Sequence, residues 1–249
     1  MSDAPPQPPA PVDAPQPGLL SALTGLWFEP GATFAALVSR PRLLPPLLLF
    51  VALGLGFTAI WTQKVDPAEF MRLQNEKSPR WEQVPPERRA AMVEQQVKFF
   101  KVFSWLGPAV FAPLAVLIVA GIYLFVFRFF YATETSYRQA LLVVAWVFAA
   151  VSTIQSPLTL GVLALKGDWN LNPQEVLQAN PTLLLDQQAT AKPLWAAAAS
   201  LDLFSFWMLF LLAAGFAASA RKRASWALPG ILVPWALWVL GKIGFAFLF

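Results

Sequence analysis

Residues 43–62 read LLPPLLLFVALGLGFTAIWT, a block of 20 residues without one charged side chain. An α-helix rises about 1.5 Å per residue, so about 20 residues cross a hydrocarbon core of about 30 Å. Pro45 and Pro46 stand in the first turn, where a missing backbone N–H costs little. The block therefore predicts a membrane-spanning helix.

Four more apolar blocks follow, at about 105–130, 137–165, 194–219 and 226–248. Over the whole chain 57% of residues are hydrophobic and 13% are charged, with a mean hydropathy of +0.55, which is too apolar for a water-soluble fold. Pro157 is expected to kink the third span or to split it. The pattern predicts an all-α integral membrane protein with five transmembrane helices.

The first 18 residues contain seven prolines and two aspartates but no lysine or arginine. A secretory signal peptide needs a basic first segment, so residues 1–18 indicate a disordered Pro-rich tail, or alternatively a polyproline ligand. Residues 19–249 form one expected membrane domain.

Between tail and first span, residues 19–40 are apolar at helical spacing but are interrupted at Pro30. We expect short amphipathic helices lying in the membrane interface, or alternatively a segment that fills a partner's groove. The candidate interfacial motif consists of Phe28, Pro30, Thr33, Phe34 and Pro41.

The distribution of basic residues predicts the orientation in the membrane. Arg221, Lys222 and Arg223 form the densest basic cluster beside a span, so that turn and the N-terminus are expected in the cytoplasm and the C-terminus outside. The 63–104 loop, expected outside, carries eight basic and six acidic residues, against the positive-inside trend. Within it we expect a helix with a Glu94–Lys98 pair, which could continue into the second span.

Two charged residues fall within the bodies of the predicted spans. Asp202 and Lys242 each cost about 2.5 to 3.5 kcal/mol at the bilayer centre on an insertion scale. Each lies about twenty residues from the 220–225 turn, so an antiparallel hairpin would place them at similar depth. We expect an Asp202–Lys242 ion pair, acting either as a structural clasp or as a proton or substrate relay.

A second polar group precedes Pro157 in the third span. Its side chains could hydrogen-bond to carbonyls freed by the proline or to another helix. The candidate polar cluster consists of Ser152, Thr153, Gln155 and Ser156.

The sequence contains no histidine and no cysteine. The commonest general base and the commonest metal ligands are thus missing. No Walker loop, nucleophile elbow, zinc spacing or paired-carboxylate motif is present. We therefore expect no enzyme activity, no catalytic residue, no cofactor and no metal. The basic residues mostly flank apolar blocks, so nucleic acid is not an expected partner.

Several segments in order resemble the Yip1 (Ypt-interacting protein) domain family in its bacterial branch. The resemblance begins at Phe28-Glu29-Pro30-Gly31-Ala32-Thr33-Phe34, with Leu37 and Arg40-Pro41 after it. It continues through Pro85-Pro86-Glu87-Arg88-Arg89, Tyr137-Arg138-Gln139-Ala140, the Asn-Pro loop and Ser200-Leu201-Asp202-Leu203-Phe204-Ser205-Phe206-Trp207.

The resemblance implies a five-helix membrane domain with a cytoplasmic N-terminus, and it implies that Asp202 belongs to a recurrent pattern of the family. Eukaryotic relatives take part in vesicle traffic with Rab-type GTPases and with one another. We expect a non-enzymatic scaffold or adaptor of a bacterial cytoplasmic membrane, with the lipid bilayer, other membrane proteins or further copies of itself as partners. The alternative is a small-solute transporter or accessory permease subunit with Asp202, Lys242 and Gln155 along its path.

Overall fold

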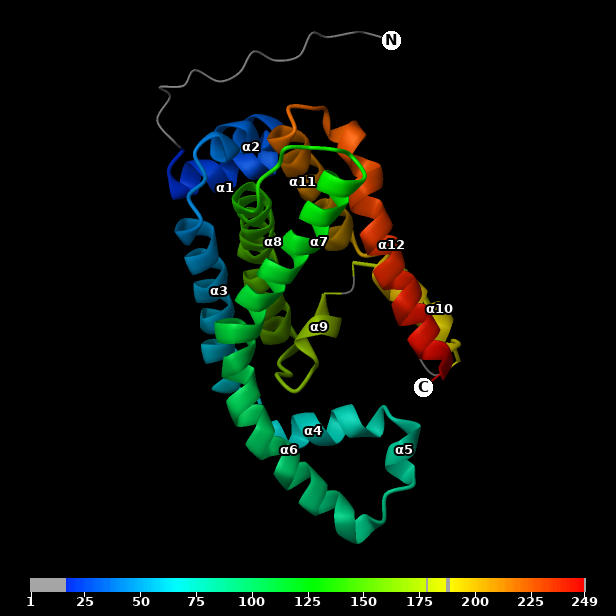
Figure 1. Cartoon of the computed structure of the whole chain (residues 1–249). Coiled ribbons are helices and arrows are strands. Elements are labelled where there is room, and N and C mark those ends of the chain that lie inside the picture. Colours follow the sequence, from blue (N-terminus) through cyan, green and yellow to red (C-terminus); the bar gives the residue numbers. More distant parts are fainter. Residues whose placement is uncertain (1–16, 178, 187–188, 249) are drawn as a thin grey trace. The chain divides into compact units, whose positions relative to one another are not determined.

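The computed structural model describes residues 17–177, 179–186 and 189–248. Residues 1–16, most of the expected tail, lie outside the described residues. The described part is helical and has no strand (Figure 1). Its elements are α1 (Leu19–Phe28), α2 (Pro30–Ser39), α3 (Leu44–Thr62), α4 (Pro67–Glu76), α5 (Pro79–Glu82), α6 (Pro86–Leu106), the π-helical η1 (Gly107–Phe111), α7 (Ala112–Phe129), α8 (Tyr137–Lys166), α9 (Pro173–Val176), the 3-10 helix η2 (Pro181–Leu184), α10 (Lys192–Ser200), α11 (Leu203–Ser219) and α12 (Ala224–Leu248).

The expected all-α membrane fold is confirmed. Four described helices are long and apolar enough to cross a bilayer, namely α3, the continuous helix Pro86–Phe129, α8 and α12. A fifth span is obtained if α10 and α11, which meet at a bend of 50°, count as one. The predicted second span thus begins inside a longer helix, and the predicted fourth span is bent.

The helix Pro86–Phe129 has 44 residues, which gives a length of about 66 Å at the α-helical rise. A hydrocarbon core of about 30 Å takes fewer than half of these residues. The charged α6 end therefore projects from the membrane, and the expected helix in the 63–104 loop does run into the second span. Pro108 lies within η1, where the wider π-turn accommodates its missing N–H.

The chain separates into two compact units. Unit 1 is formed by the described residues of Met1–Phe50, Ala115–Val151 and Gln178–Phe249, and unit 2 by Val51–Leu114 and Ser152–Leu177. That residues 19–249 act as one membrane domain stays a prediction.

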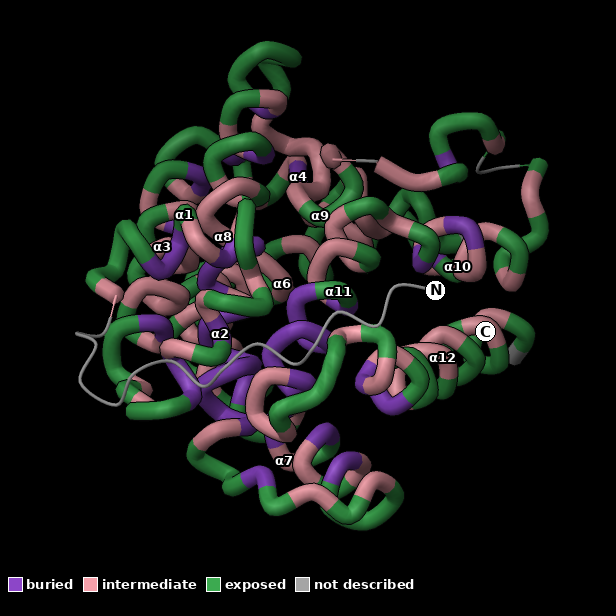
Figure 2. The backbone as a smooth tube through the Cα atoms, turned by 90° about the horizontal axis from the view of Figure 1, so that it is seen from above, coloured by how far each residue is buried: buried purple, intermediate pink, exposed green. Residues whose placement is uncertain are grey.

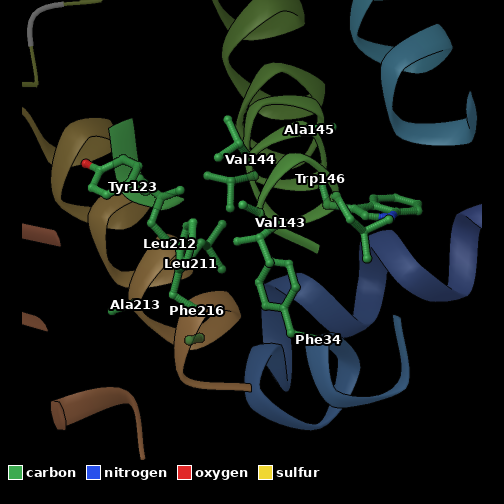
Figure 3. Packing of buried hydrophobic residues seen from close by; sticks show 14 of the residues in the cluster. Phe34, Tyr123, Val143, Val144, Ala145, Trp146, Leu211, Leu212, Ala213 and Phe216 are labelled. Carbon is green, nitrogen blue, oxygen red and sulfur yellow. The ribbon is translucent and has the colours of Figure 1, made fainter. Parts of the chain in front are cut away.

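The core of unit 1 lies between α8, α11, α7 and the α1–α2 hairpin. Phe34 of α2 packs beside Val143 of α8 and Phe216 of α11, all of them in one buried cluster (Figure 3). The buried stretches are purple in Figure 2, where most of the second half of α12 is pink and green. From Ala140 to Val151, α8 carries only apolar residues, which suits a helix packed between other helices inside a bilayer.

A glycine allows α8 and α11 to approach each other closely. A Cβ added to Gly215 would lie far inside van der Waals contact with the Cγ1 methyl of Val143. Small residues let the side chains of one membrane helix contact the backbone of another. In lipid, where no hydrophobic effect drives helices together, such close contacts stabilise the pair by van der Waals attraction. Gly215 therefore allows the close approach of α11 to Val143 of α8.

Unit 2 has a smaller core, built from aromatic rings. Trp61 at the end of α3 meets Phe70 of α4 and Phe100 of α6 edge to face, at centroid distances of 5.3 and 5.4 Å. Leu163 of α8 is fully buried in the same cluster. The ring contacts of this cluster join the end of the first span to α4 and to α6, which precedes the second span.

Candidate functional site

The broken helix formed by α10 and α11 contains the one acidic residue that was expected within a span. Leu201 and Asp202 lie between the two helices, whose axes differ by 50°. Interrupted helices in membrane proteins expose backbone polar groups that must find partners. The partners in this break are therefore the first feature of the site.

Asp202 is the N-cap of α11. Its Oδ1 accepts hydrogen bonds from the backbone N–H groups of Phe204 at 2.9 Å and Ser205 at 3.3 Å. The N–H of Leu203 donates to the carbonyl of Ala179 at 3.1 Å. An anionic cap also interacts favourably with the positive end of the helix dipole. The half-buried carboxylate thus satisfies two backbone N–H groups at the start of α11, and the carbonyl of Ala179 satisfies a third.

Lys242 approaches the same break from α12. Its Nζ donates a hydrogen bond to Ser200 Oγ at 3.0 Å, and Ser200 Oγ donates to the carbonyl of Ala196 at 2.7 Å. The structure therefore brings Lys242 to the residue two positions before Asp202. In this arrangement Lys242 contacts Ser200 while Asp202 caps α11, and a direct Asp202–Lys242 ion pair stays a prediction.

A continuous fourth span over 194–219 was expected from hydropathy, and the break at Asp202 was missed. The signal was present, since an aspartate directly before a long apolar run is typical of a helix N-cap. Hydropathy averages over a window and does not register a single capping residue. The capping role follows from the local sequence Asp202-Leu203-Phe204-Ser205.

The candidate polar cluster lies on α8 in unit 2. α8 runs through Pro157 as one helix from Tyr137 to Lys166. The hydroxyl of Thr159 donates to the carbonyl of Gln155 at 2.8 Å, within the turn that contains the proline. Ser152, Thr153, Gln155 and Ser156 share two turns of this helix, and a joint role for them stays a prediction.

The candidate interfacial motif forms a tight helical hairpin. Pro30 is the first residue of α2, as expected, and the Thr33 hydroxyl donates to the Glu29 carbonyl at 2.9 Å. Phe34 is fully buried in the core, whereas Phe28 is 81% exposed. The two aromatic residues thus point to opposite environments, and Pro41 follows the end of α2.

A glycine within α1 lets the two helices of the hairpin approach each other closely. A Cβ on Gly25 would overlap the Thr33 side chain, so α1 and α2 cross at close range. The inner face of α1 contributes Ala22, Leu23 and Leu26 to the core. Leu20 is 78% exposed, and this division of apolar residues is the one expected for a helix pair at a membrane surface.

Charge pairs lie along the polar helices of unit 2. Arg72 on α4 pairs with Glu69 and Glu76, each at 2.6 Å. The hydrogen bond from Arg72 lowers the pKa of Glu69 below its usual value. The expected Glu94–Lys98 pair is confirmed at 2.8 Å. Lys77 also pairs with Glu175, which ties α4 to α9.

The fold defines a helical multi-pass membrane protein with a broken span and an N-terminal helical hairpin. The model of the Yip1 domain family matches residues 24–248. The chain belongs to the Yip1 family, as its resemblance indicated. A search of curated proteins found no match, and neither did a search of solved structures.

Proposed function

We propose that this member of the Yip1 family is a non-enzymatic scaffold or adaptor that binds other membrane proteins or lipids. The observation that carries the proposal is the use of its intramembrane polar groups. Asp202 caps α11, and Lys242 donates to the buried hydroxyl of Ser200. Groups whose hydrogen bonds serve the fold are what a scaffold requires, whereas a solute path requires polar groups that face water.

The packing of unit 1 supports the same proposal. Seven consecutive residues of α11, from Leu211 to Ala217, are buried. They pack against the apolar face of α8 with side chains such as Val143 and Val144 between them (Figure 3). Close apolar packing favours a rigid body that presents its outer helices to partners.

The broken span raises the alternative of a small-solute transporter or accessory permease subunit. The N-terminus of a half-helix within a broken span is where transporters hold anionic substrate groups. In this chain the carboxylate of Asp202 itself occupies that N-terminus. A transport cycle would therefore need Asp202 to leave its cap.

Photo-crosslinking in native membranes tests the scaffold. A photoreactive residue at Trp238, whose side chain is 70% exposed on α12, should give a reproducible protein adduct in place of lipid adducts alone. The matched control is Ile231, which is fully buried on the same helix and should give none. Lipid adducts alone, from Trp238 and from other exposed positions of α3 and α7, would overturn the proposal that the scaffold binds other proteins.

The absence of cysteine from the sequence provides a test of the alternative. A transporter predicts that a single cysteine at Ser205 reacts with membrane-impermeant maleimides added from either side of the membrane. The scaffold predicts no reaction from either side until the protein is denatured. The proposed setting is a bacterial cytoplasmic membrane with the N-terminus in the cytoplasm and the C-terminus outside.

A further inference from the structure

A shallow hollow lies on the surface of α7 near the end of the helix. It is lined by Gly121, Leu124, Phe125, Arg128 and Phe129. Counted from Gly121, the other four lie three, four, seven and eight positions further on, so all five share one side of the helix. The core-facing stripe of α7 is a different one, formed by Val116, Ala120, Tyr123 and Phe127. The hollow therefore belongs to the outer surface of unit 1.

Apart from Arg128, the residues that line the hollow are apolar, and the hollow is open at Gly121. Phe125 and Phe129 stack at a centroid distance of 5.3 Å and an interplanar angle of 14°. A Cβ built on Gly121 would meet no heavy atom within 4 Å. The stacked rings stand beside a glycine that leaves room for a chain of methylene groups.

Arg128 places a positive charge at one end of this apolar hollow. Its side chain is exposed, and among the described residues it has no hydrogen-bond or ion-pair partner. Arg128 lies seven positions after Gly121, a rise of about 10 Å along an α-helix. An arginine in the last turn of a span extends toward the headgroup layer, where a phosphate is the natural partner for its guanidinium.

We propose that this hollow is a binding site for an anionic phospholipid. The phosphate pairs with the Arg128 guanidinium, and the upper part of one acyl chain lies along Gly121 against Phe125. A lipid with net negative charge is favoured because a zwitterionic headgroup adds an ammonium that Arg128 repels. The apolar lining of the hollow and the charge at its end match the two halves of such a lipid.

The lipid site does not rest on the scaffold proposal, because a transporter could carry the same annular site. Loss of the lipid with intact crosslinking from Trp238 would leave the scaffold in place. Loss of crosslinking with intact lipid retention would leave the lipid site in place. The two proposals can therefore fail separately.

The test is native mass spectrometry of the full-length protein, purified from nanodiscs that contain equal amounts of phosphatidylglycerol and phosphatidylethanolamine. The wild-type protein should retain phosphatidylglycerol preferentially. Arg128→Gln should reduce that preference by about fivefold, the effect of one surface cation on an anionic lipid. Gly121→Leu fills the hollow and should lower retention of both lipids.

Two matched variants control for charge and for bulk. Arg42→Gln removes another exposed cation next to a span, and Gly56→Leu fills another open glycine position on a lipid-accessible helix. Both should retain phosphatidylglycerol as the wild type does. Equal loss in Arg42→Gln, or full retention in Arg128→Gln, would overturn the proposal. Arg128 lies outside the core, so its variant should fold even if Gly121→Leu does not.

Discussion

The indole N–H of Trp61 donates a hydrogen bond to the main-chain carbonyl of Trp169 at 3.0 Å. Trp61 ends the first span, and Trp169 follows the third. The backbone N–H of Asp66 extends the contact by donating to Asn170 Oδ1 at 2.8 Å. The loops that follow the first and third spans therefore meet on the same side of the membrane. An alternating series of spans also places these two loops on one side.

This contact predicts the result of cysteine labelling in a chain that has no cysteine of its own. Single cysteines at Gln83 and Gln174, both exposed in unit 2, should react with a membrane-impermeant maleimide on intact cells. A cysteine at Lys222 should react only after lysis, because the basic turn is expected in the cytoplasm. Labelling of Gln83 and Gln174 from opposite sides would contradict the contact itself, and reversal of all three would invert the orientation.

The same hydrogen bond should contribute measurably to stability. Trp61→Phe keeps an aromatic ring against Phe70 and Phe100 but removes the donor to Trp169. We expect a loss of about 1 kcal/mol in the free energy of unfolding, and about 3 to 5 kcal/mol for Trp61→Ala, which empties the cluster. Thermal unfolding in detergent measures both changes.

Trp105 is the control for the Trp61 variants. Its ring is 43% exposed on α6, and Trp105→Phe should change the free energy of unfolding by less than about 0.5 kcal/mol. If Trp61→Phe lowered the free energy of unfolding no more than Trp105→Phe does, the hydrogen bond to Trp169 would make no net contribution to stability.

Apolar block length was enough to predict the spans, because a bilayer imposes a minimum length on every crossing helix. The Glu94–Lys98 pair was predictable for a similar reason, since an i,i+4 spacing is local. The contact between Trp61 and Trp169 was not, because 108 residues separate its partners and no local pattern encodes it. The hydrogen bond from Lys242 to Ser200 could not be predicted either, because it depends on where α10 ends and no local pattern marks that point.

Gly215 should tolerate no side chain. Gly215→Ala drives a methyl group into Val143 and should cost about 1 to 3 kcal/mol of unfolding free energy. Gly241→Ala on α12 adds the same methyl in open space and should be neutral or slightly stabilising. Adding Val143→Ala to Gly215→Ala removes the clash, so the double variant should be more stable than the sum of the two single changes predicts. A strictly additive double-mutant cycle would exclude this contact as the cause.

Arg221 has a backbone φ of 53°, a left-handed conformation in which glycine is favoured. It follows the C-cap of α11, where the N–H of Lys222 returns to the carbonyl of Ala217 at 2.8 Å. Arg221→Gly should therefore raise the free energy of unfolding by about 1 kcal/mol. Lys222→Gly, at a position without a positive φ, should give no gain, and chemical denaturation in detergent compares the two. A gain in both variants would point to loss of charge repulsion instead of backbone strain.

Asp202 separates the capping role from an intramembrane ion pair. Asparagine caps a helix about as well as aspartate, whereas alanine costs about 0.5 to 2 kcal/mol. If the contacts to Phe204 and Ser205 are the main role of Asp202, Asp202→Asn should unfold close to the wild type and Asp202→Ala should not. If the charge is needed for a pair with Lys242, both variants should lose stability, and the exchange Asp202→Lys with Lys242→Asp should restore it. The cap predicts that the exchange fails, because a lysine side chain cannot accept a hydrogen bond from a backbone N–H.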